Sequence, residues 1–280
     1  MRRVVSVVAL VACALWSAGH TQQLIPLDQV VPEEQAQAEN ESTGRWFVEL
    51  ASLPASEGTS MTALEAEEAR FHAAASAANV SYQEERHFRR LWNGLTVRAG
   101  AADAAKVKLL PGVTAVYPIV SVAVQQQDTP AISPDLATAI AQTGANTAQS
   151  AFGLSGAGVR VAVMDTGIDY DHPDLGGCFG PGCRVARGYD LVGDAYNTSS
   201  PTSVRAPDPF PDDCAGHGTH VAGIIGANGQ LKGVAPGVTF HAYRVFGCEG
   251  TTDTDVMLEA MERIAADGAD VLNMSIGPPD

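Results

Sequence analysis

The stretch VRVAVMDTGID (residues 159–169) joins a short apolar segment to an acidic turn. From Val159 to Met164 only Arg160 is polar, which is typical of a parallel strand that is buried on both faces. Further along, the pattern predicts a helix at 221–227, a strand at 238–246, an amphipathic helix at 253–267 and a buried strand at 270–276. This alternation predicts an α/β fold with a doubly wound, mainly parallel sheet, whose ligands bind beyond the carboxyl ends of the strands.

Two residues expected at that edge of the sheet have complementary chemistry. Asp165 directly follows the apolar segment, and His217 opens a helix within GHGTHVAG (216–223). A carboxylate bound to one imidazole nitrogen fixes the tautomer, so that the other nitrogen acts as a general base toward a serine hydroxyl. The sequence therefore predicts two members of a three-residue catalytic group.

The first half of the chain shows a different order of elements. Thr62 and Glu65 form a capping-box pattern at the start of a helix, and Asn79 stands where a C-cap is expected. The pattern predicts helices at 63–78 and 101–110, and strands at 46–50, near 81–86, at 91–98 and at 113–124. The order β-α-β-β-α-β is that of a small ferredoxin-like α+β domain.

The 280 residues carry a net charge of −15, which is unevenly distributed. Residues 1–130 hold 14 acidic and 10 basic residues, whereas residues 131–280 hold 18 and 7. The acidity therefore belongs mainly to the second half. It argues against nucleic acid as a partner, because a phosphate backbone requires a basic surface.

The N-terminus has the pattern of a secretory signal. Arg2 and Arg3 precede an apolar run at 4–16, and small residues follow at 17–19. We expect a signal peptide at 1–19, a flexible leader at 20–43 and a secreted, extracellular protein. The apolar run is shorter than the roughly 20 residues that span a bilayer, so we expect no membrane segment.

Four cysteines remain after the signal: Cys178, Cys183, Cys214 and Cys248. An even number in an exported protein favours two disulfides. The turn at 179–182 favours Cys178 with Cys183, which leaves Cys214 with Cys248. The other pairings stay open, and so does a zinc site, although the CxxC spacing of structural zinc sites is missing.

Several stretches, taken in order, resemble a known family. VAVMDTGIDYDHPDL (161–175), GHGTHVAGIIG (216–226), GVAP (233–236) and VLNMSIG (271–277) are similar to the motifs of subtilisin-like serine proteases. WNGLTVRAG (92–100) and LPGVTAVYP (110–118) resemble the inhibitory propeptide that precedes such domains. The resemblance implies a propeptide at 44–124, a linker and start of the mature chain at 125–150, and the N-terminal part of a peptidase domain at 151–280.

The resemblance also implies residue roles. Asp165 is then the triad aspartate, His217 the general base, and Ser275, Ile276 and Gly277 the backbone that pairs with an extended substrate. Partners are protein or peptide substrates and the chain's own propeptide, cut between about 124 and 131. No organic cofactor is required, and calcium, common in the family, has no ligand set that the sequence identifies.

One departure from the family concerns the nucleophile. The family's Gly-Thr-Ser serine and oxyanion asparagine follow the substrate strand, and the sequence matches neither, so we expect a C-terminally truncated, inactive chain. Gly58-Thr59-Ser60 has the right letters, but the helix after it is rich in charge, whereas a nucleophile helix is apolar. We interpret Ser60 or Thr62 as the cap of that helix. The alternative function is a short form that acts by binding, as a protease inhibitor or pseudoenzyme.

Two other chemistries stay open. Asp165-Thr166-Gly167 matches the aspartic-protease loop, which occurs once here, so that mechanism requires a dimer. His217 and His220, with Asp169, Asp171 and His172 nearby, suggest a metal site, although no HExxH spacing is present.

Overall fold

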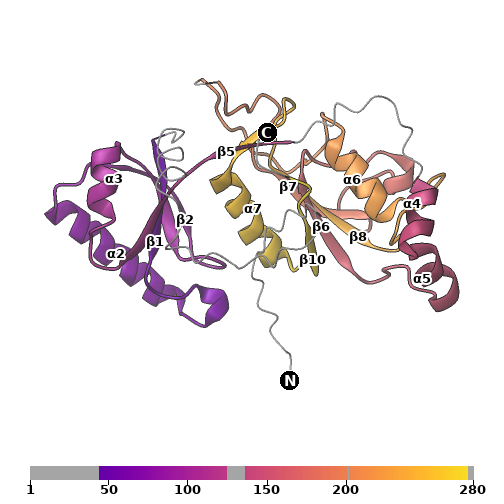
Figure 1. The fold of residues 1–280 in the computed structure, drawn as a ribbon, viewed down its shortest axis with the longest axis horizontal. Helices are drawn as coiled ribbons and strands as arrows, with labels where there is room; N and C mark the ends of the chain where they lie inside the picture. Colours follow the sequence, from indigo (N-terminus) through magenta and orange to yellow (C-terminus); the bar gives the residue numbers. More distant parts are fainter. Residues whose placement is uncertain (1–43, 125–135, 201, 277–280) are drawn as a thin grey trace, which may run out of the picture. The chain divides into compact units, whose positions relative to one another are not determined.

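The computed structural model describes residues 44–124, 136–200 and 202–276 (Figure 1). The expected signal peptide, the leader, the propeptide cleavage segment after Val124, and Gly277 lie outside these residues. Among the helices of the described ranges, none has the length and apolar character needed to cross a membrane.

Residues 44–118 form an antiparallel sheet with two helices on one face (Figure 1). The sheet has the order β2-β3-β1-β4, and β1 alternates between buried and half-buried residues. Its inward side chains pack with Phe71 and Ala75 of one helix and Ala104 and Val107 of the other. The elements are β1 (Arg45–Leu50), the 3-10 helix η2 (Ala55–Glu57), α2 (Met61–Ala77), β2 (Gln83–Phe88), β3 (Gly94–Arg98), α3 (Ala101–Val107) and β4 (Val113–Pro118). The chain order is the predicted β-α-β-β-α-β.

Details of this domain differ from the prediction. Helix α2 begins at Met61 and is capped by Ser60, whose hydroxyl accepts from the Ala63 N–H at 3.2 Å, so the predicted Thr62 cap is wrong. The single strand predicted at 113–124 is two strands, because the chain leaves the sheet after Pro118. The second, β5 (Ser121–Ala123), instead pairs antiparallel with β9 (Thr251–Asp253).

The second half is a parallel sheet with the order β10-β6-β8-β7. Successive residues of β6 face opposite sides: Ala162 and Met164 pack with the core that includes α7, and Val161 and Val163 with the core that includes α6. This two-sided burial confirms the doubly wound α/β prediction. The elements are β6 (Arg160–Asp165), the 3-10 helix η3 (Pro173–Leu175), β7 (Val185–Asp190), α6 (His217–Gly226), β8 (Thr239–Arg244), α7 (Thr254–Asp267) and β10 (Val271–Asn273).

Three features of this half were not predicted. Strand β7 was missed, and so were two helices in and beyond the expected linker, α4 (Leu136–Thr143) and α5 (Ala145–Phe152). The buried strand predicted at 270–276 is shorter and lies at an edge of the sheet, where Val271 is 49% exposed.

Candidate active site

Strand β6 and helix α6 bring Asp165 and His217 together. Asp165 is the last residue of β6 and is fully buried, while His217 is the first residue of α6. The Nδ1 atom of His217 lies 2.7 Å from Oδ1 of Asp165. The His217 side chain remains 27% exposed. The structure thus joins the two predicted residues at the carboxyl edge of the sheet.

A second carboxylate, Asp213, holds the loop that leads into α6. Its Oδ2 accepts from the backbone N–H and the hydroxyl of Thr219, at 2.9 and 2.6 Å. Its Oδ1 accepts from the Thr166 hydroxyl at 2.9 Å, and Thr166 in turn accepts from the Gly218 N–H. Asp213 also accepts from two further backbone groups, the N–H of Ala215 and the N–H of Gly216. It is therefore a positioning residue that fixes α6 against the turn after β6.

This close approach requires glycine. A Cβ atom on Gly218 would lie 2.1 Å from the carbonyl oxygen of Gly167, closer than any real contact. Gly167 itself has a φ of 109°, a left-handed conformation that side chains disfavour. The glycines thus allow the N-terminus of α6 to touch the Asp165 turn.

The electrostatics of the pair follow from burial. Burial raises the pKa of Asp165, and the hydrogen bonds from His217 and the Thr166 N–H act in the opposite direction. Its Oδ2 atom is buried without a hydrogen-bond partner among the described residues. A carboxylate at Nδ1 favours the tautomer in which Nε2 has a free lone pair. The arrangement is therefore suited to general-base catalysis at Nε2.

Both disulfides have the pairing that the sequence favoured. Cys178 is bonded to Cys183, and Cys214 to Cys248. The second bond anchors the chain three residues before His217. Arg244, which is 3% exposed, donates to Cys214 Sγ at 2.9 Å and to Asp194 at 2.7 Å.

The predicted substrate strand leaves the sheet beside Asp165. Asn273 pairs with Val163 in the parallel register, so Ser275 and Asp165 each lie two residues beyond a paired position. Ser275 is exposed, and its hydroxyl accepts from the Asn273 side chain at 3.1 Å. Ile276 packs against the α7 core. Substrate binding by these residues stays a prediction.

Other candidate chemistry has less support. Ser60 caps α2 as interpreted. Within the described ranges, His217 and His220 are not part of any group of three metal-ligand side chains. One such group contains Cys214 and Cys248, which are disulfide-bonded, and the other, Glu68, His72 and Glu84, mixes nitrogen and oxygen atoms. Calcium prefers oxygen ligands alone, so neither group suits it.

Sequence reasoning missed Asp213 and Arg244. The signal for Asp213 was its place four residues before His217, where a carboxylate accepts the free N–H groups of a helix start. The signal for Arg244 was a cation at the end of an apolar strand, β8, where the sheet edge also carries acidic residues. Arg244 contacts two of them, Asp190 at 3.2 Å and Asp194 at 2.7 Å.

Comparison with known proteins agrees with this geometry. Residues 156–280 match the model of the subtilase family, Peptidase S8. The chain is 37% identical over 199 residues to the minor extracellular protease Vpr of Bacillus subtilis, covering 69% of this chain and 24% of Vpr. It is 38% identical over 121 residues to the nisin leader peptide-processing serine protease NisP of Lactococcus lactis, covering 42% of this chain and 17% of NisP. The chain thus spans a quarter or less of the length of these relatives.

A solved structure shows the same fold. The epidermin leader peptide-processing serine protease of Staphylococcus aureus superposes with a TM-score of 0.56 and 21% identity, over 83% of this chain and 50% of that one. This likeness supports the α/β architecture alone. The family match and the relatives show that residues 156–280 form a domain of the subtilase family, homologous to subtilisin-like serine proteases.

Proposed function

We propose that this chain contributes the acid–base half of a secreted serine endopeptidase, which is made as a self-inhibited precursor. The observation that carries the proposal is the 2.7 Å contact between the buried Asp165 and the partly exposed His217. The name of the relative Vpr, an extracellular protease, and the two disulfides support secretion.

The proposed chemistry is acyl transfer to water. Nε2 of His217 takes the proton of a serine hydroxyl as its oxygen attacks the peptide carbonyl, and then passes that proton to the leaving amine. Water releases the acyl group by the same route in reverse. Asp165 orients the imidazole and stabilises its protonated form. We assign no residue of this chain to the nucleophile.

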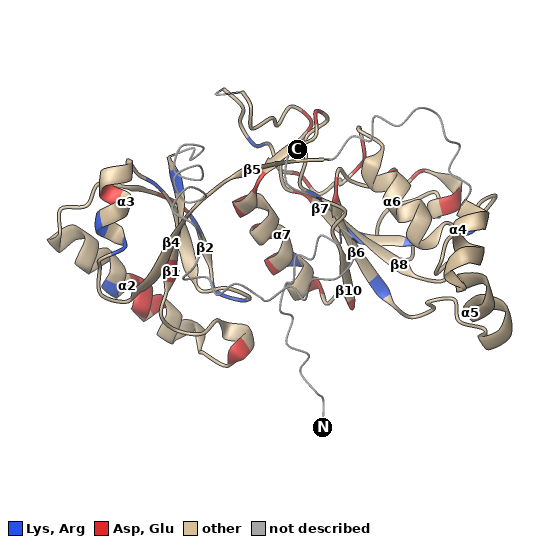
Figure 2. Ribbon diagram, viewed as in Figure 1, with Lys and Arg blue, Asp and Glu red and all other residues tan. Residues whose placement is uncertain are grey.

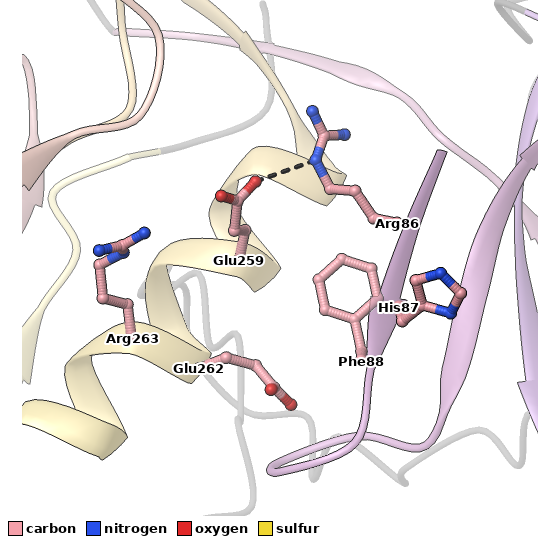
Figure 3. A pocket seen from close by; sticks show the side chains of 6 residues that line it. All are labelled: Arg86, His87, Phe88, Glu259, Glu262 and Arg263. Carbon is pink, nitrogen blue, oxygen red and sulfur yellow. Dashed lines mark ion pairs between the residues drawn. The ribbon is translucent and has the colours of Figure 1, made fainter. Parts of the chain in front are cut away.

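The proposal of self-inhibition rests on ion pairs between β1, β2 and the start of α7. Arg45 contacts Asp253 at 2.6 Å and Asp255 at 2.5 Å, and Arg86 contacts Asp255 and, at 2.9 Å, Glu259. Figure 3 shows Arg86 of β2 directed toward Glu259 of α7. Basic residues on β2 and acidic residues on α7 are also visible in Figure 2. Opposite charges on the two domains support binding of one by the other.

Glu262 of α7 adds a contact of a different kind. Its Oε1 accepts from the backbone N–H groups of Arg90 and Leu91, at 2.8 and 2.7 Å. Apolar groups also meet here. Phe47 of β1 and Trp92 of the loop before β3 line a cavity of about 440 Å³ together with Met257, Leu258 and Met261 of α7, among others. We propose that this surface holds the N-terminal domain on the peptidase domain as its inhibitor.

The test uses the protein expressed from its own gene. We expect it to remove its N-terminal domain, and we expect the His217→Ala variant to accumulate uncut. A nuclear magnetic resonance spectrum of the 280-residue chain should show a low-field Nδ1 proton of His217 that disappears in Asp165→Asn. Undiminished processing in pure His217→Ala protein contradicts the mechanism.

The same two proteins, the 280-residue chain and the protein expressed from its own gene, distinguish the proposed protease from the alternative binding function. A fluorophosphonate probe, which reacts with activated serines, should not label residues 1–280, because Ser60 is only a helix cap. Labelling that disappears in Ser60→Ala would overturn our assignment. A gene product that never processes itself but inhibits other subtilases would favour the inhibitor or pseudoenzyme.

A further inference from the structure

We propose that Glu68, His72 and Glu84 of the N-terminal domain bind a divalent transition-metal ion of the zinc type. Glu68 and His72 lie one helical turn apart on α2, so their side chains share a face. Glu84 lies on β2, an edge strand of the sheet. One ligand atom from each of the three residues lies within 4.8 Å of the other two.

The distances suit a tetrahedral ion. Nε2 of His72 is 3.2 Å from Glu84 Oε2 and 3.6 Å from Glu68 Oε1. Ligand atoms placed about 2.0 Å from a tetrahedral zinc ion are separated by about 3.3 Å. An ion can therefore be bound with small side-chain adjustments. Imidazole and carboxylate together are also ligands that zinc accepts.

The ligands are already oriented by their neighbours. The hydroxyl of Tyr82 lies 2.7 Å from Nδ1 of His72, which turns Nε2 toward the two carboxylates. Arg89 donates to the second oxygen of Glu68 at 2.6 Å. Such outer contacts orient metal ligands and tune their affinity.

His87 adds a further contact to both proposed carboxylate ligands. Its Nδ1 lies 2.8 Å from Glu68 Oε1, and its Nε2 lies 2.7 Å from Glu84 Oε1. A divalent ion bound by Glu68 and Glu84 would lie beside this imidazole, which contacts one oxygen of each carboxylate.

The experiment titrates the 280-residue chain, freed of metal by a chelator, with Co²⁺ and with Zn²⁺. We expect one Co²⁺ per chain with visible absorption bands of a tetrahedral site, and displacement by one Zn²⁺. The variants His72→Ala and Glu84→Gln should each weaken binding more than about 100-fold. His87→Gln, which removes an orienting contact, should weaken it about 10- to 100-fold. Glu65→Gln, an exposed site on the same helix with the same charge change, is the matched control and should bind as the unaltered chain does.

Circular dichroism shows whether each variant is folded. The unaltered chain provides a second test that does not depend on variants: acid should release the ion, because an imidazole ligand must be deprotonated. Failure of the unaltered chain to bind one equivalent overturns the proposal. Binding of equal strength by folded His72→Ala and Glu84→Gln also overturns it.

Discussion

Replacing Arg45 by methionine tests the ion pairs that connect the two domains. The Arg45 side chain is 11% exposed and contacts Glu85, Asp253 and Asp255, the last of which is fully buried. Methionine keeps much of the volume but removes the charge. Burial raises the pKa of Asp255, and Arg86 and Arg45 oppose that rise. Removal of Arg45 leaves Asp255 with Arg86 as its remaining cation among the residues described.

The expected cost is about 3 kcal/mol in the free energy of unfolding. Removing one partner of a buried ion pair costs roughly 3–5 kcal/mol, and the lower end applies because Arg86 stays in place. Arg98→Met is the matched control. Arg98 contacts the other oxygen of Glu85 at 2.9 Å, but its side chain is 53% exposed. Exposed pairs contribute about 0–1 kcal/mol, so the control should change stability little.

The assay is urea unfolding followed by tryptophan fluorescence. Trp46 and Trp92 both lie in the N-terminal domain, so the signal reports on the domain that Arg45 holds. The pH dependence has a defined sign. Without Arg45 the pKa of Asp255 in the folded state rises further above its ordinary value of 3.8. The folded chain then binds a proton more tightly than the unfolded chain, so stability falls as pH rises through this window.

The deficit of Arg45→Met should therefore be larger at neutral pH than in acid, where Asp255 is protonated. Two results refute the reasoning. One is a neutral-pH loss equal to that of Arg98→Met, which would mean that the ion pairs do not stabilise the contact. The other is a deficit that does not change with pH, because an uncompensated buried carboxylate must become less costly when it is protonated.

Three further outcomes are expected. Gly218→Ala should lower the free energy of unfolding by about 1–3 kcal/mol, because its Cβ would overlap the Gly167 carbonyl oxygen. Gly223→Ala, whose Cβ meets no atom within 4 Å, should leave it unchanged or raise it by up to about 1 kcal/mol. Urea unfolding measures both variants. Replacing Cys214 and Cys248 by serine opens a crosslink of separation 34 and should cost about 3.8 kcal/mol, checked by the same assay. Asp165→Asn should lower the kcat of peptide hydrolysis about 10⁴-fold in the protein expressed from its own gene, and an unchanged kcat would contradict its role.

Asp165 and His217 were predictable from the sequence, because each stands at the end of a strand or helix that the local pattern itself marks. Asp165 directly follows an apolar strand, and His217 opens a helix among glycines, so local patterns placed both at one sheet edge. Asp213 was not predictable in the same way, because its role depends on backbone N–H groups that converge only when α6 has folded. A carboxylate in a polar loop has no periodic pattern that distinguishes it from a surface residue.

The fold was predictable in its order and less so in its boundaries. Strand β7 was missed because its apolar pattern is interrupted by Arg187 and Gly188. The glycine is required there by packing, since a Cβ would lie 2.1 Å from the Ala242 carbonyl oxygen, and a pattern of hydropathy does not contain that information. Strand β10 is shorter than predicted because its pairing with β6 ends at Asn273, so hydropathy continues past the last residue in the ladder.

The contact made by Glu262 has a consequence for sequence divergence. Its carboxylate recognises the main chain of Arg90 and Leu91, and every residue except proline offers the same N–H group. The side chains at those two positions can therefore differ between relatives without loss of this contact. A proline at either position removes one of the two hydrogen bonds, because it has no backbone N–H. Arg45, in contrast, makes its contacts through its guanidinium group. A substitution at that position must therefore be accompanied by substitutions at its acidic partners. N-terminal domains from divergent relatives should thus keep the contact with Glu262 near the end of α7, whatever their sequence there. They should keep the contact with Asp253 and Asp255 at its start only if they retain the arginine.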